Sequence, residues 1–105
     1  MDNFKIIYKI LRTLEKAMEI AEFDISMISH EELGINITHW KSIMEMLLDN
    51  GYVKGISIIK TVGSNGIKID DIRITLKGLE YLSDNSLMNK AANIAKGIKE
   101  IMLGL

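Results

Sequence analysis

The chain has 105 residues, of which 13 are basic and 14 are acidic, so its formal net charge is −1. This length is typical of one domain that buries a hydrophobic core. A dedicated nucleic-acid-binding protein is more often clearly basic, so the total charge argues mildly against that class. The chain has no cysteine, which excludes disulfides, thiolate catalysis and cysteine-based zinc sites.

The beginning of the chain lacks the basic start and apolar run of a signal peptide. No stretch approaches the roughly 18 consecutive apolar residues of a membrane-spanning helix. We therefore expect a cytoplasmic protein without membrane segments.

Three helices are predicted in the first half of the chain, at residues 3–21, 29–33 and 38–50. The first and third have apolar residues three and four positions apart, the spacing of one helix face, and the second is predicted from the capping-box spacing of Ser29 and Glu32. Asn3, Ser29 and Thr38 are expected to cap their first turns, and Gly34 ends the second helix. Residues 24–28 alternate weakly between polar and apolar side chains, which predicts a short strand or a turn.

A β-hairpin is predicted over residues 52–74, because β-branched side chains dominate both of its arms. The stretch from Gly63 to Gly66 is expected to form its turn. The return strand is expected to break at a second turn, at Asp70-Asp71. Thr75 then ends the strand pattern and is expected to cap a helix over residues 75–84.

The last predicted helix spans residues 86–103, and its apolar residues recur with a heptad rhythm. This stripe could pack against the first helix of the same chain or pair with a second copy of the protein, since both arrangements produce the same spacing. We expect residues 1–105 to form one domain, with residues 86–105 as a homodimerisation element. The expected dimer-interface residues are Leu87, Ala91, Ile94, Ile98, Ile101 and Leu105.

The predicted fold class is α+β, a winged helix-turn-helix with an extra C-terminal helix. Three stretches carry a closer resemblance: Phe4 to Leu11, Trp40 with Met46 to Tyr52, and Ile74 to Leu82 with Ser86 to Met88. Through them the chain resembles the YjcQ-like proteins of Gram-positive bacteria and their prophages. The resemblance covers nearly the whole chain. It implies a winged-helix fold and a phage or mobile-element source, and it transfers no catalytic motif.

In a winged helix-turn-helix, the helix over residues 38–50 would enter a DNA major groove. On its outward side, Lys41 and Ser42 could contact phosphate or base edges, and Glu45 could accept a hydrogen bond from a cytosine amine. His39 could reach a phosphate at the start of the helix. The hairpin would hold the phosphate backbone. The candidate DNA-binding residues are His39, Lys41, Ser42, Glu45, Lys60, Asn65 and Lys68.

The charges are divided unevenly between these two elements. Residues 21–50 carry six acidic side chains and one basic one, a balance of −5, whereas residues 51–77 carry five basic and two acidic ones, a balance of +3. Affinity for the DNA backbone comes mainly from neutralising phosphates, so the hairpin would have to supply it. The alternative is a protein-interaction module that docks through the acidic face of residues 22–49.

The sequence contains no pattern typical of an enzyme or a metal site. His30 and His39 are the only histidines, and neither lies at ligand spacing from a second histidine. The glycines at 63 and 66 lack the lysine and the following helix of a phosphate-binding loop. We expect no catalysis, no metal and no cofactor. The expected partners are double-stranded DNA and a second copy of the chain.

Overall fold

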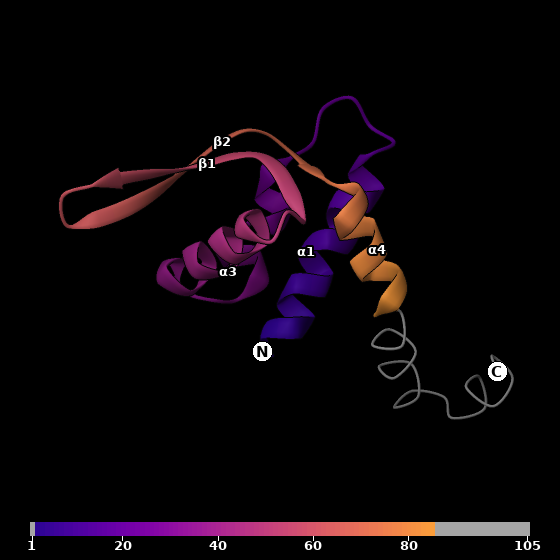
Figure 1. The fold of residues 1–105 in the computed structure, drawn as a ribbon, viewed down its shortest axis with the longest axis horizontal. Coiled ribbons are helices and arrows are strands. Elements are labelled where there is room, and N and C mark those ends of the chain that lie inside the picture. The colour runs from indigo at the N-terminus through magenta and orange to yellow at the C-terminus, as the bar shows by residue number, and fades with distance from the viewer. Residues whose placement is uncertain (1, 86–105) are drawn as a thin grey trace, which may run out of the picture.

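The computed structural model describes residues 2–85, and within them the chain is α+β. The elements are α1 (Asn3–Ala17), the 3-10 turn η1 (Ile25–Ile28), α2 (His30–Leu33), α3 (Ile37–Asp49), β1 (Val53–Thr61), β2 (Ser64–Ile74) and α4 (Leu76–Asp84). Helix α1 lies between α3 and α4, and the hairpin of β1 and β2 projects away from the helices (Figure 1). This is the arrangement of a winged helix-turn-helix, as the sequence predicted.

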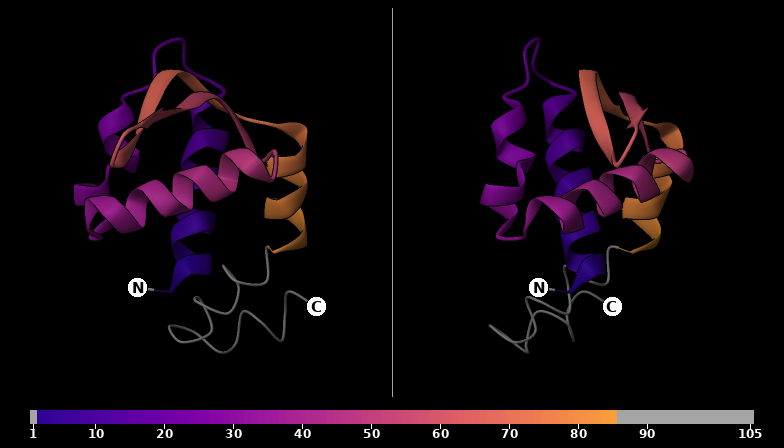
Figure 2. Two further views of the ribbon diagram at one scale, coloured as in Figure 1. Left: turned by 60° about the vertical axis from the view of Figure 1, so that its left-hand side comes forward. Right: turned by 90° about the vertical axis from the view of Figure 1, so that its left-hand side faces the viewer.

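The core forms where α1, α3 and the base of the hairpin meet. Helix α3 lies across α1, with the hairpin above both (Figure 2). No polar or charged residue is buried within the described chain. Each large apolar side chain removed from water stabilises the fold by about 1.5–3 kcal/mol. The most deeply buried side chains are Ile6, Ile10, Leu11, Leu14, Ile28, Leu33, Ile43, Met44, Leu47 and Val53.

Helix α1 is shorter than the predicted range of 3–21. It is capped by Asp2 rather than Asn3, since the Asp2 carboxylate accepts the Phe4 amide at 2.7 Å. It ends at Ala17, where the Arg73 guanidinium of β2 donates to the Ala17 carbonyl at 3.2 Å and to the Ala21 carbonyl at 3.4 Å. The Ala17 carbonyl also accepts the Ile20 amide at 3.2 Å, so a side chain from β2 adds a second donor to the carbonyl at which α1 stops.

The helix-turn-helix is built from η1, α2 and α3. Residues 25–28 form a 3-10 turn rather than a strand, and Ser29 and Gly34 delimit α2 as predicted. Helix α3 begins one residue earlier than predicted, because Asn36 rather than Thr38 caps it and accepts the His39 amide at 2.8 Å. The Trp40 indole donates to the Ile28 carbonyl at 2.8 Å, which fastens α3 to η1.

The hairpin differs from the prediction in two places. Its strands close at the Thr61–Ser64 pair, so the turn is Val62-Gly63 rather than the longer stretch 63–66. Asp70-Asp71 makes no turn, and β2 runs unbroken through it. The pairing is instead interrupted opposite Gly55, so three residues of β2 face one of β1. The prediction of a turn at these aspartates was wrong because the irregularity is a bulge in the pairing.

Gly55 makes this bulge possible. Its φ of 83° lies in the left-handed region that favours glycine. A Cβ at residue 55 would also lie 1.9 Å from the Asp71 carbonyl oxygen, far inside contact distance. The β2 backbone therefore approaches β1 more closely than any side chain would allow.

The junction between the hairpin and α4 is centred on Thr75, which caps α4 as predicted. Its hydroxyl donates to the Gly51 carbonyl at 2.5 Å and accepts the Gly78 amide at 3.1 Å. Its own amide donates to the Tyr52 carbonyl at 3.1 Å. Gly78 packs so tightly that a Cβ there would lie 2.5 Å from that same Tyr52 carbonyl oxygen. The predicted helix over 86–103 lies outside the described residues.

We expect Gly55→Ala to lower the free energy of unfolding by about 2–4 kcal/mol, because it adds a backbone clash to an unfavourable φ. Gly63→Ala is the matched control. Gly63 also has a positive φ, of 90°, but an added Cβ would meet nothing within 4 Å. It should cost only about 1–2 kcal/mol. Urea denaturation of both variants measures the difference, and equal losses would contradict the close approach of Asp71.

We expect Thr75→Val to lower the free energy of unfolding by about 1–2 kcal/mol, because valine keeps the shape but loses both hydroxyl hydrogen bonds. Thr75→Ser keeps the hydroxyl and should lose much less. Thermal denaturation followed by circular dichroism compares the two variants. A Thr75→Val protein as stable as Thr75→Ser would show that the hydroxyl does not hold the junction.

Candidate nucleic-acid interface

Helix α3 turns a polar stripe toward solvent. Ile43, Met44 and Leu47 are buried against the core, and Trp40 and Leu48 are partly buried beside them. The residues opposite this apolar face follow at helical spacing. They are Thr38, Ser42, Glu45 and Asp49, flanked by Lys41 and Met46. Lys41 is the one cation of α3, and it is half-buried, so the surface that would meet a DNA groove is largely acidic or neutral.

Several predicted contact residues of α3 already have partners within the protein. His39 is half-buried, and its Nε2 lies 2.6 Å from the Asn3 Oδ1, which joins the first turns of α3 and α1. The Ser42 hydroxyl is exposed and donates to the Thr38 carbonyl at 3.2 Å, within the same helix. Glu45 is half-buried. His39 therefore has a structural contact, whereas Lys41, Ser42 and Glu45 remain reachable from solvent.

The two lysines predicted to hold the phosphate backbone lie on opposite faces of the hairpin. In the register, Lys60 pairs with Asn65, and Lys68 pairs with Ser57. Because side chains alternate along a strand and paired residues share a face, Lys60 falls on the face that is buried at Ile56. Lys68 falls on the other face. The sequence prediction grouped them as one contact, but the register separates them.

These lysines also differ in their electrostatic surroundings. The Lys68 ammonium lies 3.6 Å from the Asp70 carboxylate, and both side chains are 62% exposed. Exposed pairs of this kind contribute little to stability, but the carboxylate reduces the attraction of Lys68 for a phosphate. Lys60 is exposed, and no described residue forms an ion pair with it. Lys60 is therefore the stronger candidate of the two.

Two more cations of the hairpin region are committed elsewhere. Arg73 is only 27% exposed at its side chain, and it pairs with Asp71 at 3.2 Å while it binds the carbonyls at the end of α1. The Lys77 ammonium lies 5.6 Å from the centre of the Tyr52 ring, a cation–π contact. Sequence reasoning counted both charges as available. Lys54 lies near the base of the hairpin and is exposed to solvent, so its charge remains available.

A second basic surface lies on α1, whose exposed side carries Lys5, Lys9, Arg12 and Lys16, here called the α1 stripe. Arg12 forms an ion pair with Glu15 on the same helix, and no other described acidic residue pairs with this stripe. The simplest interpretation of the α1 stripe is a solvated helix surface, which is the ordinary role of such a pattern.

No group of three or more His, Asp or Glu side chains within residues 2–85 is placed to hold a metal ion. Among those residues, no helix is both long enough and apolar enough to cross a bilayer. Among the described residues, the pKa values of Asp24 and Tyr81 are shifted from their ordinary values. Hydrogen bonds from the Ser26 hydroxyl and amide lower the pKa of Asp24, and burial, followed by the nearby Tyr52 and Asp2, raises the pKa of Tyr81.

Comparison with known protein families shows to which family the chain belongs. The family model described as "YjcQ protein" matches residues 8–101, well over half of the sequence. The chain belongs to the YjcQ family. No curated protein and no solved structure matches it. Membership agrees with the resemblance seen in the sequence and specifies neither a ligand nor a partner for this YjcQ protein.

Sequence reasoning missed two features of the interface. Thr38 lies on the outward stripe of α3, because the true cap is Asn36, another residue type that favours caps. The contact between Asn3 and His39 joins residues 36 positions apart, so no local pattern predicts it. The predicted dimer-interface residues, Leu87 to Leu105, lie outside the described residues.

Proposed function

We propose that this YjcQ protein is a small DNA-binding regulator, of the type carried by phages and mobile elements, and not an enzyme. One observation carries the proposal. The hairpin projects from the core at the same side as the N-terminal end of α3, so a helix and a wing are presented together (Figure 1). This is how winged helix-turn-helix proteins meet a DNA duplex. Fold alone does not decide function, so the residues must carry the test.

In the proposed complex, α3 enters the major groove. Lys41 and Ser42 contact phosphate or base edges, and Glu45 accepts from a cytosine amine. Lys60 holds the backbone from the wing. Glu45 and Asp49 repel nearby phosphates, so the site selects against DNA whose groove does not offer Glu45 a donor. The predicted homodimer through residues 86–105 belongs to this proposal, because two copies would read two half-sites.

A second candidate function rests on the charge of α3. Asp49 lies in its last turn, where no basic residue balances the negative end of the helix dipole. An acidic group there costs about 0.3–1 kcal/mol. Asp49 thus destabilises its own helix, and it lies on the same stripe as Glu45. A negative charge kept at this position fits a surface that docks a basic partner protein. In that case the acidic face of residues 22–49 is the functional surface and DNA is not bound.

We expect Lys60→Glu to lower affinity for a selected DNA fragment by about tenfold at low salt and to reduce the log–log salt slope by about one. Lys68→Glu should have a smaller effect, because Asp70 already offsets that charge. The measurement is a salt titration of binding to a pool of bacterial and prophage fragments, followed by the retained fragment alone. Equal effects of both variants would contradict the offset of the Lys68 charge by Asp70. No effect on a retained fragment would remove the wing from the site.

We expect Asp49→Lys to raise the free energy of unfolding by about 0.5 kcal/mol, and Asp84→Lys, at the end of α4, to do the same. Only Asp49→Lys should also tighten DNA binding, by about threefold or more, because it replaces repulsion with attraction at the groove. The same titration measures both variants. If the wild-type protein and both variants fail to retain DNA, the docking function replaces the first proposal.

A further inference from the structure

The outer edge of β2 has no strand beside it among residues 2–85. Within the described chain the sheet has two strands, so β2 pairs with β1 on one side only. The segment nearest its other edge is residues 23–28, and no backbone hydrogen bond joins that segment to β2. The outward N–H and C=O groups of an edge strand are a template for another chain.

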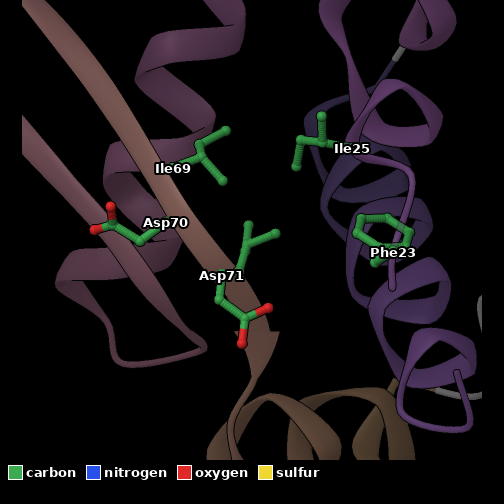
Figure 3. A pocket seen from close by; sticks show the side chains of 6 residues that line it. Phe23, Ile25, Ile69, Asp70 and Asp71 are labelled. Carbon is green, nitrogen blue, oxygen red and sulfur yellow. The ribbon is translucent and has the colours of Figure 1, made fainter. Parts of the chain in front are cut away.

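A cleft lies along this free edge. It has a volume of about 270 Å³ and is lined by Phe23, Ile25, Ile69, Asp70, Asp71 and Ile72. Ile69 of β2 and Ile25 of η1 point toward each other across it, with Phe23 beside Ile25 (Figure 3). Ile25 is 38% exposed, so part of this apolar wall faces solvent. The cleft therefore presents apolar walls next to an unsatisfied strand edge.

The unpaired charges around the cleft are acidic. Glu22 and Asp24 are exposed at the start of the facing segment. Asp71 lies at the end of the cleft (Figure 3), where it pairs with Arg73 at 3.2 Å. Asp70 points to the opposite side of β2 from Ile69, and among the described residues it pairs only with Lys68, across an exposed 3.6 Å contact that exchanges at little cost. A partner with positive charge is therefore favoured.

We propose that this cleft binds an extended basic peptide segment of a partner protein, which adds to β2 as a third strand. Side chains of a strand alternate between its two faces. One row of the bound segment therefore lies against Ile69 and Ile25, and the other row lies on the side of Asp70. This selects a sequence in which apolar and basic residues alternate. Main-chain hydrogen bonds to β2 supply affinity, and the two rows supply specificity. The site uses neither α3 nor DNA.

The probe is a fluorescein-labelled peptide of sequence Lys-Val-Lys-Val-Lys-Val, blocked at both ends, and the measurement is anisotropy with the full chain. The wild-type protein should bind it, and Ile25→Lys should weaken binding by about tenfold, because the variant places a charge on the apolar wall. The matched control is Met27→Lys. It adds the same charge to the same 3-10 turn at a 51% exposed residue that does not line the cleft, so it should bind like wild type.

A second peptide tests strand addition directly. N-methylation of alternate residues removes the backbone donors that a strand must supply, so the methylated peptide should not bind. Absence of wild-type binding, equal weakening by both lysine variants, or equal affinity for the methylated peptide would each overturn the proposal. Circular dichroism of both variants excludes unfolding as the cause of a loss. Because no DNA enters the assay, failure here leaves the proposed DNA-binding function standing.

Discussion

The arrangement of this protein depends on the contact between Thr75 and the backbone at Gly51 and Tyr52. Thr75 comes directly after β2, and Tyr52 directly before β1, so their hydrogen bonds join both ends of the hairpin. The Tyr52 amide donates to the Leu47 carbonyl at 2.9 Å, which ties the same point to the end of α3. Because Gly78 has no side chain, the first turn of α4 can pack directly against the Tyr52 carbonyl. The direction of the wing relative to α3 is therefore set within a few residues.

The open sheet edge has a local cause. The Asp24 carboxylate accepts both the amide and the hydroxyl of Ser26, at 3.0 and 2.7 Å. Such short-range bonds compete with strand pairing, and here they fold residues 25–28 into a 3-10 turn. The Gly55 bulge acts on the same region of β2, because it shifts the register between Ile69 and Arg73. The 3-10 turn and the bulge together leave the outer edge of β2 without a pairing strand beside the cleft.

Features that depend on local sequence were predictable, and those that depend on distant contacts were not. Ser29 and Thr75 were predicted as caps because a cap requires only a polar side chain near the first turn. The end of α1 was missed because one of the contacts at its last carbonyl comes from Arg73, 56 residues away. The register of the hairpin is set by the turn at Val62-Gly63. The sequence predicted a longer turn, because the glycines at 63 and 66 enclose polar residues. Either turn places Lys60 and Lys68 on opposite faces of the hairpin, so their separation was missed because the prediction assigned no strand face to either lysine.

The structure also links the proposed DNA binding to the proposed dimer. Of the five cations in residues 51–77, Arg73, Lys68 and Lys77 have partners in the protein, which leaves Lys54 and Lys60. Each phosphate neutralised contributes about 0.9 to the salt slope, so these two wing cations alone would gain little from the backbone. Affinity at physiological salt then has to come from base contacts by α3, from cations outside the wing such as Lys41, or from a second copy that doubles the phosphate contacts. A dimer would therefore strengthen the proposed DNA complex, whereas docking of a protein on the acidic face needs no second copy.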